Sequence, residues 1–392
     1  MSETVPAFER AEYTARQAKT RAAMEKAGVE VLVATDPSNM NWLTGYDGWS
    51  FYVHQAVILV PEGEPLWFGR PIDKAGVRLT TFLDAASAFS YPDHYVQNPK
   101  VHPYQILAAV LRDKGLGKAR IGVEMDNYYF SAKCLEVLRA ELPDAKIVDV
   151  TALVNWQRAV KSARELDYMR RAARVVESIH ARIREVADVG LRKCDLVAQI
   201  YDAALTGPEG GDYAAIVPLT PSGADASAAH LTWDDRKMKR GEGTFFEVAG
   251  CYRRYHVPLS RTMFLGEPPV AMLRAQDAVF EGLQAGLEMA RPGNTCGQVA
   301  EAFFAVLRKY GIEKDNRTGY PVGVSYPPDW GERTMSLRPG DPSILEENMT
   351  FHFMPAIWTD EWGYESSETI RIRSGAAAEC LSDVARELTV KR

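Results

Sequence analysis

One stretch of the sequence, GTFFEVAGCYRRYHVPLSRTMFLG at residues 243–266, has the outline of a β-hairpin. A single acid, Glu247, lies in its apolar first half, and strand alternation puts it on the same face as Phe245. A buried carboxylate is costly unless a cationic or hydrogen-bonding group faces it. The stretch therefore indicates either a structural ion pair, with Arg253 or Arg261 as partner, or a carboxylate that recognises a cation or takes part in catalysis. We favour the functional carboxylate.

The composition around this stretch is that of a globular protein large enough for two domains. The chain has 392 residues, of which 46% are hydrophobic and 25% are charged. The formal net charge of −6 disfavours a general electrostatic attraction to nucleic acid or to an anionic membrane. We therefore expect the protein to act on a small molecule, and not to bind nucleic acid or a membrane.

The five cysteines are far apart in the sequence, odd in number and never closely paired, so neither a disulfide framework nor a zinc knuckle is indicated. They are Cys134, Cys194, Cys251, Cys296 and Cys380. The first residues show no basic segment followed by an apolar run. We expect reduced thiols and a cytoplasmic location.

Hydrophobic periodicity divides the chain into two differently organised parts. The first part, residues 1–160, is expected to be a mixed α/β domain, with a helix at 7–27 and strands at 30–34, 52–60, 120–124 and 146–150. The second part, residues 161–392, opens with a long helix whose apolar residues recur every three or four positions: Leu166, Met169, Ala173, Val176, Ile179, Ile183 and Val186. Further helices are expected at 193–206, 271–290 and 297–310, short strands between 213 and 266, and two more strands at 349–357 and 364–373.

This order of elements, together with two motifs, resembles the creatinase, aminopeptidase P and prolidase family. The motifs are NWLTG at residues 41–45 and KSAREL at residues 161–166. The resemblance covers essentially the whole chain. It implies an α+β architecture, with a smaller creatinase-like domain over residues 1–160 and a pita-bread catalytic domain over residues 161–392.

The same resemblance shows where this chain departs from the metal-dependent members. Their hairpin carries two ligand aspartates, which match Glu247 and Pro258 here. Their ligand histidine, in a Gly-His-x-x-Gly pattern, matches Tyr320, and their two ligand glutamates match Met354 and Ser367. Two divalent cations need several oxygen or nitrogen donors, which proline, methionine and one carboxylate do not supply. The sequence therefore predicts a site without metal or other cofactor.

Creatinase, a member of the family, likewise hydrolyses a C–N bond with side chains alone. Its catalytic histidine is matched in spacing by His230, which lies eleven residues before Gly241. The plain alternative for His230 is a histidine with an ordinary structural role. With the resemblance, we expect Glu247 and His230 to be the catalytic residues.

Several other residues are expected to bind substrate. Strand alternation aims His352 at the same cavity as the position of the lost glutamate, and places Glu365, rather than Glu368, on the face of Ser367. Tyr320 replaces a ligand, although a buried tyrosine bonded to the backbone is the alternative. Aromatic residues near these motifs are either ordinary core or a cage for an organic cation. The candidates for the cage are Trp49, Phe51, Tyr52, Tyr326, Trp330, Trp358, Trp362 and Tyr364, of which we expect Trp49, Tyr52, Trp330 and Trp362 to bind substrate.

A carboxylate, aromatic walls and a histidine without metal point to a small substrate with a cationic C–N system. The resemblance implies that this substrate is the zwitterion ectoine, a cyclic amidine with a carboxylate, whose ring is opened to N-acetyl-2,4-diaminobutyrate. It leaves hydroxyectoine open as a second substrate. It further implies a homodimer, and leaves open whether residues 49–54 contribute to the pocket of their own subunit or to that of the neighbouring subunit. It also leaves open whether a partner deacetylase binds.

Three other functions compete with this one. They are a creatinase-like amidinohydrolase, an Xaa-Pro metallopeptidase with unfamiliar ligands such as His256, His352 and Glu365, and a non-catalytic binding module of the same fold.

Overall fold

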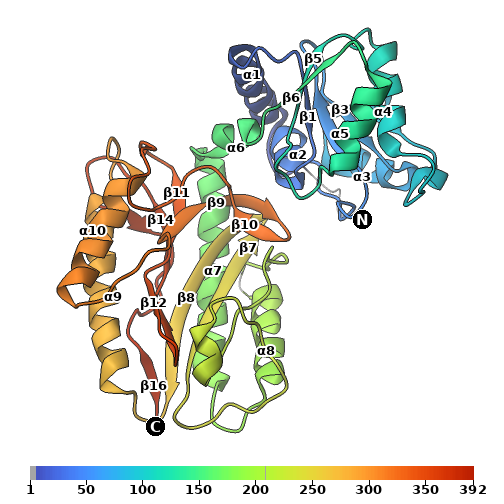
Figure 1. Ribbon diagram of the computed structural model, residues 1–392. Coiled ribbons are helices and arrows are strands. Elements are labelled where there is room, and N and C mark those ends of the chain that lie inside the picture. The colour runs from blue at the N-terminus through green and yellow to red at the C-terminus, as the bar shows by residue number, and fades with distance from the viewer. Residues whose placement is uncertain (1–5, 208) are drawn as a thin grey trace. The chain divides into compact units, whose positions relative to one another are not determined.

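The computed structural model describes residues 6–207 and 209–392 and divides into two compact units, Met1–Arg158 and Ala159–Arg392. Both units mix helices with β-sheet (Figure 1). No helix in the described residues is long and apolar enough to cross a membrane.

The first unit is built on a six-stranded mixed sheet in the order β4-β3-β2-β1-β5-β6. Its strands are β1 (Val31–Ala34), β2 (Ala56–Leu59), β3 (Leu66–Gly69), β4 (Ala88–Ser90), β5 (Arg120–Val123) and β6 (Lys146–Asp149). Its helices are α1 (Arg10–Lys26), α2 (Pro37–Thr44), α3 (Lys74–Thr80), α4 (Pro103–Asp113), α5 (Ala132–Glu141) and α6 (Leu153–Arg158). Helices α4 and α5 lie side by side on one face of the sheet (Figure 1), where Leu107 and Leu138 join Ile58 and Ile121 in one core.

The strand expected at residues 52–60 is shorter than its sequence pattern. Strand β2 begins only at Ala56, because residues 51–53 form a turn in which Val53 N donates to Ser50 O at 3.1 Å. The aromatic run before β2 therefore belongs to a loop, and Tyr52 is 65% exposed.

The second unit contains an eight-stranded sheet with the central order β15-β14-β11-β9-β8-β16, to which β7 adds on β8 and β10 on β9. Strands β12 and β13 form a separate ribbon. The strands are β7 (Gly243–Tyr252), β8 (Tyr255–Leu265), β9 (Gly319–Tyr326), β10 (Asp329–Gly331), β11 (Thr350–Phe353), β12 (Ala356–Trp358), β13 (Gly363–Glu365), β14 (Glu368–Arg371), β15 (Glu379–Cys380) and β16 (Thr389–Lys391). The helices are α7 (Ala163–Val186), α8 (Lys193–Thr206), α9 (Val270–Met289) and α10 (Cys296–Lys309).

Helix α7 begins where the KSAREL motif predicts. The Ser162 hydroxyl accepts from the Glu165 backbone N–H at 3.3 Å, and the Glu165 carboxylate accepts from the Ser162 N–H at 2.7 Å, which forms a capping box. The preceding Lys161 makes a buried ion pair with Glu332 at 2.8 Å. The apolar stripe of α7 is buried against β7 and β8, except that Val186 is only partly covered.

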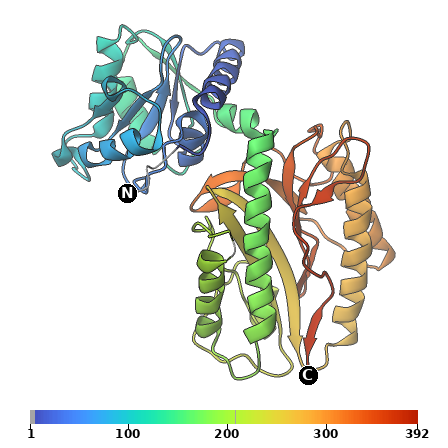
Figure 2. The same cartoon turned by 180° about the vertical axis from the view of Figure 1, so that it is seen from behind.

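The hairpin of β7 and β8 is longer and more continuous than the expected short strands. Its ladder runs from Gly243 opposite Phe264 to Tyr252 opposite Tyr255. Residues 213–242, in contrast, contain only isolated bridges and the short 3-10 helix η4 (Gly223–Ser227). Seen from behind, α7 and α8 lie beside this hairpin (Figure 2).

Helices α9 and α10 form the other packed layer of the unit. They pack on each other and contribute Leu283, Phe303 and Leu307 to a core that includes Phe353 of β11 and Ile370 of β14. Figure 2 shows both helices on the side of the unit that carries these C-terminal strands. The strands between the two helical layers carry the polar cluster described next.

Candidate active site

The carboxylate of Glu247 is buried inside the second unit on the central part of β7. Residue 247 lies opposite Ser260 of β8, and its backbone also bonds with Leu219 in both directions at 3.0 Å. Ser260 in turn donates its backbone N–H to the Ser367 hydroxyl at 2.7 Å. Three segments far apart in sequence thus meet around one acid.

His352 is the polar side chain that faces Glu247. It lies on β11, directly opposite Tyr320 of β9, and is fully buried. Its Nε2 lies 2.8 Å from the Ser367 hydroxyl and its Nδ1 lies 3.2 Å from the Tyr320 hydroxyl. The Nδ1 atom is also 3.9 Å from Glu247 Oε1, which is too long for a hydrogen bond. Two hydroxyls therefore hold the imidazole beside the carboxylate.

Tyr320 is itself held by Trp330. The indole Nε1–H of Trp330, on β10, donates to the Tyr320 hydroxyl oxygen at 2.7 Å. Trp330 is fully buried, so its ring supports the tyrosine from inside the unit. Tyr320 is thus bonded to side chains of this cluster, and not to the backbone as in the plain alternative.

Glu365, at the end of β13, adds a second carboxylate to the cluster. The ligand atoms of Glu247, His352 and Glu365 all lie within 4.8 Å of one another. Both Glu365 oxygens are buried and make no hydrogen bond of good geometry among the described residues, although the Ser260 hydroxyl is close enough to lower the pKa of Glu365. An acidic pair without a cation is costly in such a place. The cluster therefore favours a positively charged group between the two acids.

The protonation of this cluster follows from its burial. Burial, and then the charge of Glu365, raise the pKa of Glu247 well above its ordinary value. Burial also raises the pKa of Glu365 to about 7. Burial lowers the pKa of His352 to about 3, so the imidazole is neutral at physiological pH. Tyr320 keeps its proton, since burial and then Glu247 raise its pKa well above 10. A cation bound between the two acids would displace these protons.

The residues at the five family ligand positions do not fit a two-metal centre. Tyr320 and Ser367 are bonded to the imidazole of His352, Pro258 and Met354 carry no oxygen or nitrogen donor in their side chains, and Glu247 is the one acid of the five. Metal-binding donor sets do occur elsewhere in the described residues. One is the trio of Glu247, His352 and Glu365, and the other is His54, His102 and Cys134 in the first unit.

The expected catalytic His230 is placed differently from the other candidates. It is exposed in the turn that follows η4, and no hydrogen bond or ion pair joins it to Glu247 in the described part of the chain. Helix η4 itself contacts β7 and β13, the strands that carry Glu247 and Glu365. His230 is therefore a loop residue near two site strands, and not a member of the buried cluster.

The expected aromatic candidates are dispersed. Trp330 is buried behind Tyr320, and Trp362 is partly buried against the core beneath α9 and α10. Trp49 and Tyr52 belong to the first unit and are 54% and 65% exposed. Within the second unit, Trp330 and Trp362 therefore do not form a cage by themselves, because both rings are occupied by protein contacts.

The structural ion pair considered for Glu247 is not formed. Arg261 instead binds Glu368 at 2.7 Å, and Arg253 is exposed at the hairpin turn. His256 lies outside the cluster, because its Nε2 accepts from the Ala215 N–H at 2.9 Å and its Nδ1 lies 2.9 Å from the Arg254 carbonyl.

One charged residue near the cluster was missed in the sequence. Lys314 lies in the loop after α10, within the run EKDNR at residues 313–317, which has the composition of an ordinary solvent-exposed loop. No local pattern marks one lysine of such a run as partly buried. Lys314 is distinguished from the other residues of this run only by its contacts in the folded chain.

The chain is similar to known proteins over nearly its whole length. Residues 167–374 match the model of metallopeptidase family M24, and residues 16–160 match the creatinase/prolidase N-terminal domain. The ectoine hydrolase of Halomonas elongata is 53% identical, over 98% of each chain. The solved dipeptidase PepE of Mycobacterium ulcerans has a TM-score of 0.82 at 25% identity, covering 98% of this chain and 99% of its own. The prolidase of Thermococcus sibiricus shares the fold, with a TM-score of 0.83 at 18% identity over 96% of this chain and 99% of its own.

Proposed function

This chain belongs to metallopeptidase family M24, and from that premise we propose that it is a hydrolase that opens the ring of ectoine without a metal ion. The observation that carries the proposal is the buried pair of Glu247 and Glu365, which has no lysine or arginine within ion-pair distance among the described residues. The similarity to the ectoine hydrolase of Halomonas elongata supports the substrate. Ectoine carries a cyclic amidinium, which is the kind of group that such a pair attracts.

Glu247 binds the amidinium in the proposed mechanism. When the cation enters, Glu247 loses its proton and pairs with a ring N–H, because an opposite charge favours the ionised carboxylate. Water then adds to the ring carbon that bears the methyl group. One ring C–N bond breaks, the nitrogen that departs takes a proton, and the product is N-acetyl-2,4-diaminobutyrate.

Two residues compete for the proton transfer from water. His230 is the candidate implied by the resemblance, and as a loop residue it must approach the cluster when substrate binds. Glu365 is the candidate inside the cluster, and its pKa of about 7 suits a general base near neutral pH. His352 is a weak base with its lowered pKa, so we assign it the role of orienting the hydroxyls of Tyr320 and Ser367.

Replacement of the two candidates separates their roles. Loss of a positioned acid–base group costs roughly 100- to 10,000-fold in kcat. We expect His230→Ala to lose most activity and keep its fold; near-normal turnover would exclude His230 and leave Glu365→Gln as the substitution that abolishes proton transfer. Circular dichroism confirms the fold of each variant.

A covalent route is the variant of this mechanism. In that route a Glu247 oxygen attacks the amidinium carbon, and water later resolves the adduct. Intact-mass measurement during turnover of a slow substrate decides between the two. An unmodified protein mass at every time point excludes the covalent route.

The decisive test of the function is mass-resolved turnover with a panel of substrates. Ectoine, hydroxyectoine, creatine and proline dipeptides are each incubated with the enzyme, with Glu247→Gln as the inactive control. We expect ring opening of ectoine and none of the proline dipeptides. Cleavage of creatine or of a dipeptide, with ectoine untouched, contradicts the proposal.

The trio of Glu247, His352 and Glu365 supports a second candidate, a hydrolase that uses one metal ion. A chelator separates the two. Ectoine turnover that survives exhaustive EDTA treatment agrees with the metal-independent proposal, whereas loss with EDTA and recovery with manganese supports the metal-dependent one.

A further inference from the structure

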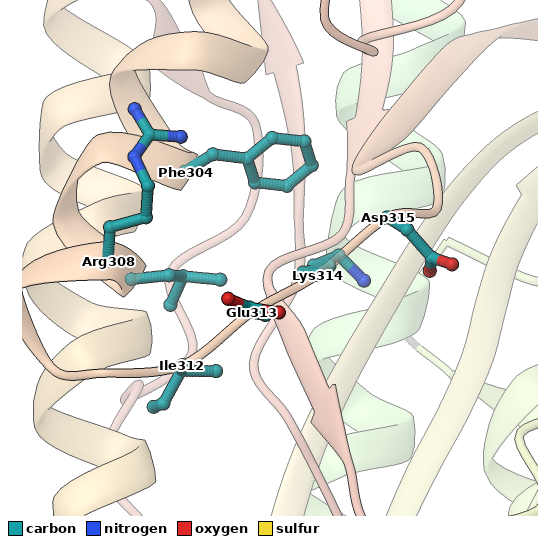
Figure 3. A pocket seen from close by; sticks show the side chains of 7 residues that line it. Phe304, Arg308, Ile312, Glu313, Lys314 and Asp315 are labelled. Atoms are coloured by element: carbon teal, nitrogen blue, oxygen red, sulfur yellow. The ribbon is translucent and has the colours of Figure 1, made fainter.

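The loop between α10 and β9 brings a cation to the edge of the acidic cluster. Residues 312–315 of this loop line a cavity on the α10 side, together with Phe304 and Arg308 (Figure 3). In that view the Lys314 ammonium points away from Arg308. A second cavity, of about 320 Å³, is lined by residues 312–316 and by Ala356 to Trp358 of β12.

The position of the Lys314 ammonium is fixed by Trp358. Its Nζ lies 4.8 Å from the centre of the Trp358 ring, within the range of a cation–π contact. Strand pairing sets Trp358 opposite Gly363 and Ala356 opposite Glu365. Because alternate residues of paired strands share one face, Trp358 and Glu365 lie on the same face as diagonal neighbours. Lys314 therefore lies on the face of the ribbon that carries Glu365.

Lys314 has no close ion-pair partner in the described part of the chain. Lys314 makes no ion pair within 4.0 Å of an acid among the described residues, and its one hydrogen bond goes to the Asn316 side chain at 2.6 Å. An ammonium group has three donors, so two are free for a ligand. Burial lowers the pKa of Lys314 to about 8, while Glu365 acts in the opposite direction. Glu365 and then Asp315 favour the charged form of Lys314 from beyond ion-pair distance, so the ammonium can still bind an anion in direct contact.

The substrate proposed above has both charges that this arrangement lacks. Among the described residues, Glu247 and Glu365 have no lysine or arginine within ion-pair distance, and Lys314, on the face of Glu365, has no acid within that distance. Resting on the proposed function, we propose that Lys314 binds the carboxylate of the zwitterionic substrate while Glu247 and Glu365 receive its amidinium. Lys314 thereby selects cyclic amidines that carry a carboxylate over those that do not.

Arg317 is the competing cation of the same loop. Its guanidinium lies 4.5 Å from the centre of the Tyr320 ring, near the His352 end of the cluster, and its Nη1 donates to the Ser336 hydroxyl at 3.4 Å. Arg317 is exposed, whereas Lys314 is partly buried. We assign the carboxylate to Lys314 because the lysine shares a face with Glu365.

A comparison of two substrates tests the assignment. Wild type and Lys314→Met are assayed with ectoine and with 2-methyl-tetrahydropyrimidine, which is the same cyclic amidine without the carboxylate. One charge-assisted hydrogen bond corresponds to roughly 10- to 100-fold in binding. We expect Lys314→Met to raise the KM for ectoine by that factor and to leave kcat/KM for the carboxylate-free amidine within about twofold. Lys314→Arg, which keeps the charge, is expected to recover part of the loss.

The matched control is Lys309→Met, which removes a lysine of the same region that is exposed and paired with Glu281 at 3.4 Å. It should leave both substrates unaffected, and thermal unfolding checks that each variant is folded. An equal loss on both substrates, or a carboxylate-specific loss in Arg317→Met but not in Lys314→Met, overturns the assignment while the proposed function stands. No ectoine turnover by wild type overturns both together.

Discussion

At the scale of single residues, the site depends on two acids that share one buried place. Glu247 and Glu365 come from different strands, β7 and β13, and each has a raised pKa mainly because of burial. A pair of carboxylates with unequal environments is a common way to obtain one acid and one base at neutral pH. Here the pair also prepares the site for a cation, since the bound amidinium compensates the charge that burial disfavours.

The stability of the empty enzyme should report this pair. Folding raises the pKa of Glu365 from its ordinary 4.5 to about 7, so the folded chain holds this proton more tightly than the unfolded chain. The stability contributed by the group is therefore present below about pH 4.5 and is lost as the pH rises through about 7. Glu365→Gln removes the ionisation. We expect it to raise the free energy of unfolding at pH 8 by roughly 1–3 kcal/mol, with little effect near pH 5.

Urea unfolding of wild type and Glu365→Gln at both pH values measures this difference. Glu368→Gln is the contrasting variant, because Glu368 is also buried but pairs with Arg261 and Arg386 at 2.7 and 2.8 Å. Loss of that partner should destabilise the protein. A Glu365→Gln protein that is less stable than wild type at pH 8 contradicts the prediction.

At the scale of elements, the sequence pattern located helices better than strands. The helix at 193–206 and the start of α7 agree with the structure, because apolar periodicity and a capping box are local signals. The strand expected at 349–357 is instead two short strands, β11 and β12, which belong to different sheets. Pairing partners come from distant segments, so a strand's end depends on the neighbour that it meets.

The contact between β7 and α7 depends on one glycine of the opening stretch. A methyl group on Gly250 would meet the carbonyl oxygen of Ala172 and would lie 2.6 Å from the backbone N of Val176. Both are backbone atoms of α7, which cannot move aside without shifting the helix from the sheet. We expect Gly250→Ala to destabilise the second unit by about 3 kcal/mol or more.

Differential scanning calorimetry of Gly250→Ala measures this loss as a lower unfolding temperature. Gly76→Ala is the matched control, since Gly76 is helical and its nearest neighbour, Tyr46, is at an ordinary 3.4 Å. Alanine at that position should be neutral or slightly stabilising. An unchanged unfolding temperature for Gly250→Ala would mean that α7 does not pack as closely as described.

At the scale of the whole molecule, the resemblance implies a homodimer in which the first unit of one subunit serves the other's pocket. Trp49 and Tyr52 are the exposed aromatic residues proposed for that role. Mixing two inactive variants tests it. If Tyr52→Ala and Glu247→Gln damage sites in different subunits, half of the randomly mixed dimers contain one intact site, and activity returns to about a quarter of wild type.

The same mixture also identifies the opposite arrangement, in which each chain serves only its own pocket. When Tyr52 and Glu247 serve the pocket of their own chain, every pocket in a mixed dimer carries one of the two substitutions. Activity then stays at the level of the separate variants. Size-exclusion chromatography with light scattering establishes the dimer beforehand. A monomer at micromolar concentration contradicts the proposed assembly.

The sequence by itself determined the fold class and the family, because these depend on motifs and on the order of elements, and through the resemblance it predicted a site without metal. It also marked Glu247, a lone acid in an apolar strand. Only the tertiary structure decided which residues meet it. His352, Ser367 and Glu365 lie more than one hundred residues from Glu247 in the sequence and meet it only in the folded chain, and Lys314 reaches the face of Glu365 from a loop with no distinctive pattern. Such proximity is a property of long-range packing, which no local spacing encodes.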